Sequence, residues 1–488
     1  MYKQKWLAKL SFSSFALAFL PGAVLAQDAA AVLKRATAMM GEPKSIRYVA
    51  DGTGFTFGQA FVPGQPWPKI TVHNQTRSIN YETSAMRDEV TLSRAEPNGG
   101  GGYPLQGQGQ QRNDQFVSGD KAWNMAGANP QPGPRFIFDR VHQLWTTPHG
   151  VIKAAMKNSA IVSFSNEAGK SIAAVKFTEP GRFVATAFFD ESFILQRVES
   201  RLPDPVLGEV SAVIKYSAYR DFGGTLFPMR IEQSQGGFPT LDVNVKEVQP
   251  NAAVDIKIPE QVEKFVERVT TEKVAEGVWH VAGGSHNSVA IEMKDHMVLV
   301  EAPLNEGRSA PVIAEVKKLA PGKPIRFMIN SHNHFDHSGG VRTAAAEGAT
   351  IVVQSASKAF FEKTLSAKTT IAPDALSKLG KKAKIVSISA DRTEMKDSSR
   401  SIEIHRIKDG IHNDAFLMVY LPAEKLLIEA DAFTPPPPNS APPATPNANH
   451  VNLIDNIERL KLVVDKILPL HGRVVPVADL YTAASRKR

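Results

Sequence analysis

The 488-residue chain contains no cysteine. This excludes disulfide bonds, cysteine nucleophiles and the zinc sites that use thiolate ligands. Beyond the N-terminus the chain also lacks an apolar run long enough to span a membrane. The net charge of +8 is small for this length, and the basic residues are scattered rather than interleaved with aromatics, so a nucleic-acid groove is not indicated. The length itself allows two or three domains.

The first 26 residues have the pattern of an export signal. Lysines at positions 3, 5 and 9 precede an apolar core at residues 10–20, and small residues follow at 23–26. The core is shorter than the roughly 20 residues that a membrane span needs. Residue 27 is glutamine, not the cysteine of a lipid-anchored lipoprotein. We therefore predict that residues 1–26 are removed, that the protein is periplasmic or secreted, and that no stable membrane insertion remains.

Metal-binding side chains are densest at His332, His334, Asp336 and His337, in the pattern His-x-His-x-Asp-His. Imidazole and carboxylate together suit zinc, and also iron or manganese. Four ligands this close along the chain cannot all bind one ion comfortably. Alternation in an extended loop points His332 and His334 the same way, whereas Asp336 and His337 follow where the chain begins to turn. The spacing therefore suggests two metal ions close together.

The residues around this motif predict how it is held. Residues 324–330 are mostly apolar and predict a buried strand, and residues 341–347 predict a helix after Gly339 and Gly340. The end of a strand that leads into a helix is where open α/β sheets usually place their chemistry.

The motif resembles that of the metallo-β-lactamase superfamily, and the resemblance runs from about residue 274 to the C-terminus. Three later segments resemble the loops that complete the family's site, and they contain His412, Asp431 and His471. The resemblance implies two divalent metal ions, zinc first, with iron or manganese as alternatives. It implies the following ligands: His332, His334 and His412 for the first ion, Asp336, His337 and His471 for the second, and Asp431 as a bridge.

The same resemblance implies an αββα sandwich. We therefore predict an α+β chain with a signal peptide at residues 1–26, a mainly antiparallel β domain at 27–265 and the metallo-β-lactamase-like domain at 266–488. Asp336 would act in catalysis by orienting the nucleophile or carrying its proton. Residues 277–300 resemble the family's first hairpin, whose loop lies near the metals, so His286 is a candidate for contacting substrate. The alternative for His286 is a turn histidine that caps the hairpin.

The region before the metal domain has the alternation of β-strands. Leu241, Val243 and Val245 would face one way and the polar residues between them the other. Residues 219–228 and the runs after them resemble periplasmic lipoprotein-carrier domains, which are curved antiparallel sheets. No catalytic constellation is visible there, and His73, His142 and His149 are interpreted as structural. We therefore expect an independently folded domain that lies apart from every ligand and without which the metal domain keeps its activity.

These features predict an exported metal-dependent hydrolase whose metal-bridging hydroxide cleaves a carbonyl ester, lactone or thioester of a small-molecule substrate. The aspartate at position 431 is the pattern of the glyoxalase- and lactonase-like members rather than of the β-lactamases. A β-lactamase and a single-iron sulfur oxygenase of the same superfamily remain alternatives. Another is a periplasmic protein that binds an apolar ligand and carries a vestigial metal domain. The sequence leaves open the oligomeric state and whether the proline-rich residues 434–449 form a wall of the site.

Overall fold

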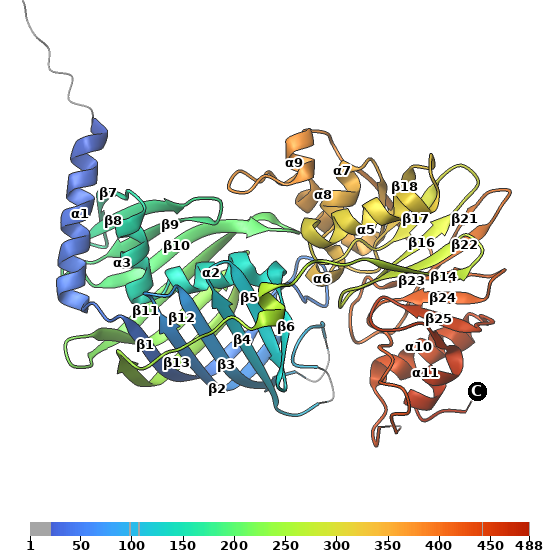
Figure 1. Cartoon of the computed structure of the whole chain (residues 1–488), viewed down its shortest axis with the longest axis horizontal. Coiled ribbons are helices and arrows are strands. Elements are labelled where there is room, and N and C mark those ends of the chain that lie inside the picture. Colours follow the sequence, from blue (N-terminus) through green and yellow to red (C-terminus); the bar gives the residue numbers. More distant parts are fainter. Residues whose placement is uncertain (1–20, 97–98, 106–107, 442, 488) are drawn as a thin grey trace, which may run out of the picture.

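The computed structural model describes residues 21–96, 99–105, 108–441 and 443–487, with side chains from Asp28 onward (Figure 1). Most of the predicted signal peptide, residues 1–20, lies outside the described residues, and residues 21–26 form the start of helix α1 (Pro21–Met40). Among the described side chains of α1, the first buried one is that of Ala29, which lies after the predicted cleavage point. None of the helices in the described ranges combines the length and the apolar character that crossing a membrane requires.

The N-terminal part is one thirteen-stranded antiparallel sheet in the order β6-β5-β4-β3-β2-β1-β13-β12-β11-β10-β9-β8-β7. Every neighbouring pair is a hairpin except β1 with β13, which joins the first and last strands. The strands are β1 (Ser45–Phe55), β2 (Lys69–Asn80), β3 (Ala85–Arg94), β4 (Gln111–Ser118), β5 (Lys121–Ala126), β6 (Asn129–Pro132), β7 (Ile161–Glu167), β8 (Lys170–Glu179), β9 (Phe183–Phe189), β10 (Leu195–Asp204), β11 (Gly208–Asp221), β12 (Leu226–Gln235) and β13 (Phe238–Pro250).

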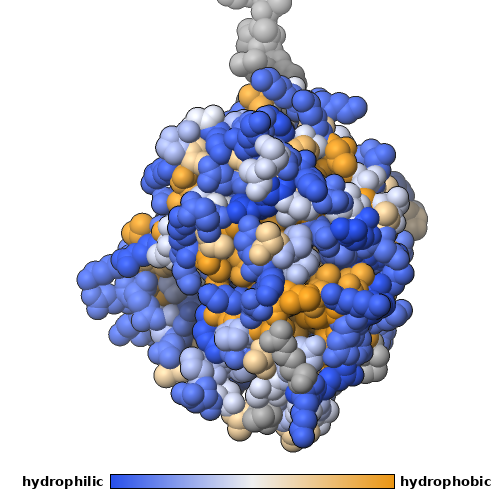
Figure 2. Space-filling view, turned by 90° about the vertical axis from the view of Figure 1, so that its right-hand side faces the viewer, coloured by the Kyte–Doolittle hydropathy of each residue, from blue (hydrophilic) through white to orange (hydrophobic). Residues whose placement is uncertain are grey.

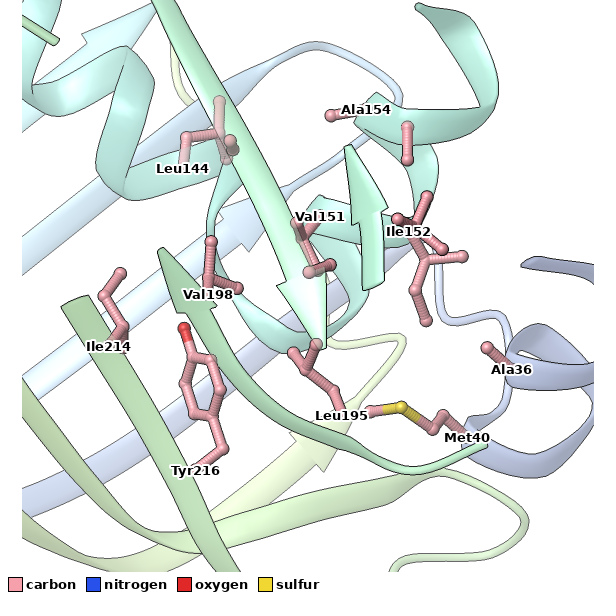
Figure 3. Packing of buried hydrophobic residues seen from close by; sticks show 14 of the residues in the cluster. Ala36, Met40, Leu144, Val151, Ile152, Ala154, Leu195, Val198, Ile214 and Tyr216 are labelled. Atoms are coloured by element: carbon pink, nitrogen blue, oxygen red, sulfur yellow. The ribbon is translucent and has the colours of Figure 1, made fainter. Parts of the chain in front are cut away.

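The apolar face of this sheet packs against helices α1, α2 (Ile137–Trp145) and α3 (Pro148–Lys157). Successive side chains of a strand point to opposite faces of the sheet, so every second residue packs against the helices. Val243 and Val245, for example, are both buried on this face. The close view in Figure 3 shows side chains from the helices facing those from the strands, namely Ala36, Met40, Leu144, Val151 and Ile152 facing Leu195, Val198, Ile214 and Tyr216. The helices thus fill the face that a carrier of apolar ligands would keep open.

The three histidines of this region make structural hydrogen bonds. His73 pairs with Ser93 (2.8 Å), His142 with Ser200 (2.7 Å) and His149 with the carbonyl of Met40 (3.0 Å). Burial lowers the pKa of His142 and of His149 to about 4. Both rings are therefore neutral in the folded protein at neutral pH.

We expect these two histidines to make stability fall as the pH is lowered from about 6.5 to about 4. In that pH range these two histidines are protonated in the unfolded chain but stay neutral in the folded chain, so lowering the pH favours unfolding. Urea midpoints measured with a chelator present should decrease over this range. In the His142→Gln/His149→Gln variant the decrease should be smaller, and an equal decrease in both proteins would contradict the assignment.

The C-terminal part is a sandwich of two mixed sheets with helices outside (Figure 1). The first sheet, in chain order, contains β14 (Thr270–Ala275), β15 (Val278–Ala282), β16 (Ser288–Glu292), β17 (Met297–Val300), β18 (Ile325–Ile329), β19 (Thr350–Gln354) and β20 (Lys384–Ile388). The second contains β21 (Arg392–Lys396), β22 (Ser401–Arg406), β23 (Leu417–Leu421), β24 (Leu426–Glu429), β25 (Lys466–Pro469) and β26 (Val475–Pro476). The main helices are α5 (Glu306–Leu319), α6 (Phe335–Ser338), α7 (Val341–Ala346), α8 (Lys358–Ser366), α9 (Ala375–Leu379), α10 (Ala448–Arg459) and α11 (Val477–Ala483).

Two apolar cores hold this sandwich together. One lies between the sheets and beneath α10 and α11, and the other lies under α5 and α7. The central strands are buried on both faces, as in Met297–Val300 and Leu417–Leu421, which explains their uninterrupted apolar sequences. Figure 2 shows the molecule from the sandwich end, where hydrophobic residues form a band across a largely hydrophilic face.

One predicted element is wrong in part. The apolar spacing of residues 452–467 predicts a single helix, but α10 ends at Arg459 and β25 begins at Lys466. The chain turns between them, with Lys461 at a positive φ of 54°. After the turn, Val464 is buried while Val463 is 56 % exposed. The burial of these residues is therefore set by the packing of the extended chain and not by a helical repeat.

Candidate metal centre

The first cluster of candidate ligands comes from two loops of the sandwich. His332 and His334 follow β18, and His412 lies in the loop between β22 and β23. The Nε2 atoms of His332 and His412 are 3.2 Å apart. Two nitrogens bound to one tetrahedral zinc at about 2.05 Å would be roughly 3.4 Å apart. These rings are therefore spaced as ligands of one ion.

His334 would bind a metal ion through Nδ1, whereas His332 and His412 would use Nε2. Its Nε2–H donates to the carbonyl oxygen of Ala60 (3.1 Å), which fixes the tautomer and leaves the lone pair on Nδ1. Nδ1 is buried and has no hydrogen-bond partner within the described part of the chain. A buried unpaired nitrogen is costly unless something binds it. Other histidines among the described residues also have an unpaired Nδ1, namely His149, His405 and His450. This atom therefore indicates a metal ion only because His334 lies in the cluster with His332, His412 and Asp431.

The second cluster joins α6, the first hairpin and the end of β25. His286, Asp336, His337 and His471 each place one ligand atom within 4.8 Å of the others. Nε2 of His337 and Nε2 of His471 are 3.1 Å apart. His286 is buried and its Nε2 lies 3.1 Å from Oδ2 of Asp336. The structure thus places His286 inside the cluster, and its contact with substrate stays a prediction.

Asp431 lies between the two clusters. Its Oδ2 is 3.2 Å from His332, 2.9 Å from His412 and 3.0 Å from His337, all measured to Nε2. Its Oδ1 is 2.9 Å from Nε2 of His471. One carboxylate therefore touches imidazoles of both sets, which is the position that the superfamily resemblance implies for a bridge.

The charge of the site suits cation binding. Burial lowers the pKa of His332 to about 3, and burial also holds the pKa of His334 well below its usual value. Both rings are thus neutral at pH 7, as metal ligands must be. Burial would raise the pKa of Asp431, but the neighbouring imidazoles, His337 first, outweigh burial and hold it well below its usual range. Neutral His332 and His334 beside the ionised Asp431 are donors for a divalent cation. Burial would lower the pKa of His337, but Asp431 and Glu301 outweigh burial and raise it well above its usual value, so a metal ion would replace the proton of that ring.

Glu301 forms a hydrogen bond with His337, a candidate ligand of the second cluster. It is fully buried directly after β17. Its Oε2 lies 2.7 Å from Nδ1 of His337, and its Oε1 accepts from the hydroxyl of Ser331. Hydrogen bonds of this kind fix the orientation and basicity of a ligating imidazole. The backbone of Glu301 has a positive φ of 64°, a conformation tolerated here because both of its side-chain oxygens are bound.

The expectation that the N-terminal domain lies apart from every ligand is wrong. Gln59 donates from Nε2 to Oδ1 of Asp336 (2.9 Å), and Ala60 accepts from His334. A glycine-rich loop also reaches the site, held by Arg94, whose guanidinium donates to the carbonyls of Gly99, Gly100, Gly101 and Pro104. The amino-acid sequence shows this segment only as a run of glycines. Such a run predicts a flexible loop and does not indicate that the loop contacts the candidate ligands.

Gly101 is the point of closest approach. A Cβ atom at this position would lie 2.6 Å from Cε1 of His412 and 2.7 Å from Cε1 of His334. Carbon atoms cannot approach so closely, so a side chain here must displace the loop or the imidazoles. The space beside the first cluster therefore leaves no room for a side chain at position 101.

We expect Gly101→Ala to weaken binding of the first metal ion by about tenfold or more, because it pushes on two of its ligands. Zinc titration against a chromogenic chelator would measure this. Gly109 is the control, since a Cβ there would meet nothing within 4 Å. Gly109→Ala should bind zinc like the wild type, and equal affinities in all three proteins would contradict the close contact.

A cavity of about 1270 Å³ adjoins these loops. Its lining includes Ile411, next to His412, and Arg473, two residues after His471. Much of the remaining wall is the proline-rich segment, from Thr434 to Ala448, and Ser93 and Arg94 contribute from the N-terminal domain. Pockets for drug-sized ligands usually measure about 300–1,000 Å³, so this space can hold a large substrate. The proline-rich segment thus lines a cavity whose wall includes sequence neighbours of His412 and His471, while none of the seven candidate ligands is among its lining residues.

Comparison with known proteins identifies the C-terminal part. Residues 281–471 match the model of the Metallo-beta-lactamase superfamily, and this range includes all seven predicted ligands. No curated protein matches the chain. The family resemblance and the predicted fold class are therefore confirmed: the C-terminal half has the metallo-β-lactamase fold and follows a large antiparallel sheet.

Solved metallo-β-lactamases are among the similar structures. One from Pontibacter korlensis has 16 % identity and a TM-score of 0.35, with 45 % of this chain and 98 % of that chain covered. One from Hirschia baltica has 20 % identity and a TM-score of 0.34, with 45 % and 99 % covered. FIM-1 from Pseudomonas aeruginosa in the mono-zinc form has 19 % identity and a TM-score of 0.35, with 44 % and 93 % covered.

Proposed function

Because residues 281–471 match the metallo-β-lactamase superfamily, we propose that this protein is a metal-dependent hydrolase that cleaves a carbonyl ester, lactone or thioester. The observation that carries the proposal is Asp431, whose two oxygens contact histidines of both clusters. Such an arrangement suits two divalent ions, with zinc as the first choice. Bound ions would lower the pKa of water to near neutrality and polarise the carbonyl oxygen under attack.

The protein's own residues would position the reaction. Asp336 is 23 % exposed, more than the other candidate ligands, so its carboxylate can orient an attacking water and take up its proton. His332, His334 and His337 are fully enclosed and can only hold ions. The cavity beside the site would receive the part of the substrate that does not react.

Hydrolysis of a substrate panel tests the proposal. Zinc-loaded protein should turn over at least one member of a set of aryl esters, lactones and thioesters, and His332→Ala should not. His405 provides the control, because its ring pairs with Glu403 on β22 and lies outside both clusters. His405→Gln should keep the activity. Turnover that survives in His332→Ala, or no turnover of any ester, lactone or thioester, would refute the proposal.

The alternative of a carrier for apolar ligands finds less support. The apolar face of the N-terminal sheet is packed by α1, α2 and α3, and its residues are almost fully buried. A ligand would have to displace these helices to reach it.

Export is the remaining part of the proposal. If residues 1–26 are a signal peptide, N-terminal sequencing of protein from the periplasm or the medium should begin at Gln27. The buried contacts of α1 from Ala29 onward would survive this cut. An intact Met1 on soluble cytoplasmic protein would contradict export.

A further inference from the structure

Four residues of the N-terminal domain, Gly58, Gln59, Ala60 and Phe61, run alongside the metal-binding loops. The amide of Phe335 donates to the carbonyl of Gly58 (3.1 Å), and the amide of Asp414 donates to that of Phe61 (3.0 Å). The ring of Phe335 also meets Phe57 with 5.3 Å between centroids. The segment is thus fixed against the loop that carries Asp336 and the loop that carries His412.

Gln59 is the one side chain of these four that reaches a candidate ligand of the second ion. It is only 8 % exposed, and its Nε2 donates to Oδ1 of Asp336 (2.9 Å). The other oxygen of Asp336, Oδ2, lies 3.1 Å from Nε2 of His286. The carboxylate is therefore held from two sides, by one residue of each domain.

The main chain of the same glutamine also fixes the glycine-rich loop, because the backbone carbonyl of Gln59 accepts from the amide of Gly101 (3.2 Å). The backbone from Gly58 to Phe61 is therefore tied to the loops on both sides of Gln59, which limits how far its side-chain amide can follow Asp336 if that side chain rotates. A donor fixed in this way selects one orientation of a carboxylate.

We propose that Gln59 is a positioning residue of the metal centre: its side-chain amide holds Asp336 in the orientation that binds the second ion. The N-terminal domain thereby completes the active site instead of only adjoining it. This inference rests on the proposed function, because it takes Asp336 as a ligand and as the group that orients the attacking water.

A purely structural role is the competing explanation. Gln59 is buried at a domain contact, so its loss could loosen the whole interface and weaken both ions alike. Gln59→Met separates the two roles, since methionine keeps the length and packing of the side chain and removes only the hydrogen bond.

The experiment is a zinc titration of the full chain with competing chelators, repeated with cobalt(II), whose visible spectrum reports the coordination of each site. Gln59→Met should bind the second ion about 10- to 100-fold more weakly and the first ion normally. The control is Gln196→Met, because Nε2 of Gln196 donates in the same way to Oδ2 of Asp190 (2.8 Å) within the N-terminal domain. It should bind both ions like the wild type.

The outcomes are distinguishable. If Gln59→Met binds two ions as tightly as the wild type, or loses both ions equally, the positioning role is overturned and the proposed function stands. If the wild type itself binds fewer than two ions, the proposed function is refuted, and with it the role of Gln59 that rests on it. Should Gln59→Met not fold, Gln59→Asn keeps the amide but withdraws it from Asp336 by about one carbon–carbon bond. It should show the same selective loss, and normal affinity there would equally overturn the role.

Discussion

Asp431→Ala should lose both tightly bound zinc ions and roughly a thousandfold of the hydrolytic rate. The carboxylate contacts imidazoles of both clusters, so its removal takes a ligand from each ion at once. It also removes the negative charge that offsets two neighbouring divalent cations. A metal contribution of several kcal/mol to the transition state corresponds to a rate factor of this size. Elemental analysis after zinc reconstitution and desalting measures the first effect, and kcat/KM on the best ester measures the second.

Asp465 provides the matched control for this variant. Its carboxylate is 58 % exposed and lies 3.9 Å from Nζ of Lys425, on the surface of the same domain. Asp465→Ala should keep two zinc ions and full activity. Wild-type protein that holds one ion or none, or an Asp431→Ala variant that keeps two, would refute the binuclear centre.

The sequence could predict the two clusters because the strongest signal is local. His332, His334, Asp336 and His337 lie within six residues, and the order of the later candidates follows a known family pattern. The structure brings all seven candidates together, in the two sets that the resemblance implies. That they bind metal remains a proposal.

The contribution of the N-terminal domain could not be predicted in the same way. Gln59 and Asp336 are separated by 277 positions, and neither the composition nor the alternation around Gln59 marks it as polar and buried. A strand pattern specifies which face of a sheet is apolar, but it carries no information on which domain the connecting loops will touch. The expectation that this domain lies apart from every ligand was wrong for this reason. Removing residues 27–265 would take Gln59, Ala60 and Gly101 away from the metal centre.

The largest selectivity should lie between leaving groups. Asp431 would add a negative charge between the two ions, which reduces their effective positive charge. The site is then less able to stabilise the anion of an amide nitrogen, which is a poor leaving group. An alkoxide or a thiolate leaves more easily and needs less stabilisation. We therefore expect esters, lactones or thioesters to be hydrolysed at least about a hundredfold faster than β-lactams, which corresponds to roughly 2.7 kcal/mol in the transition state.

A series that differs in one atom isolates this effect. A five-membered lactone, thiolactone and lactam with the same side chain have nearly the same shape. Dividing kcat/KM on zinc-loaded protein by the rate of hydrolysis with hydroxide alone would remove their different intrinsic reactivities and report how well the site expels each leaving group. The expected order is thiolactone and lactone well above lactam, with a chromogenic cephalosporin weak or inert. A cephalosporin value a hundredfold above every ester would show that a bridging carboxylate does not prevent expulsion of an amide nitrogen. In that case the β-lactamase assignment would replace the esterase and lactonase one.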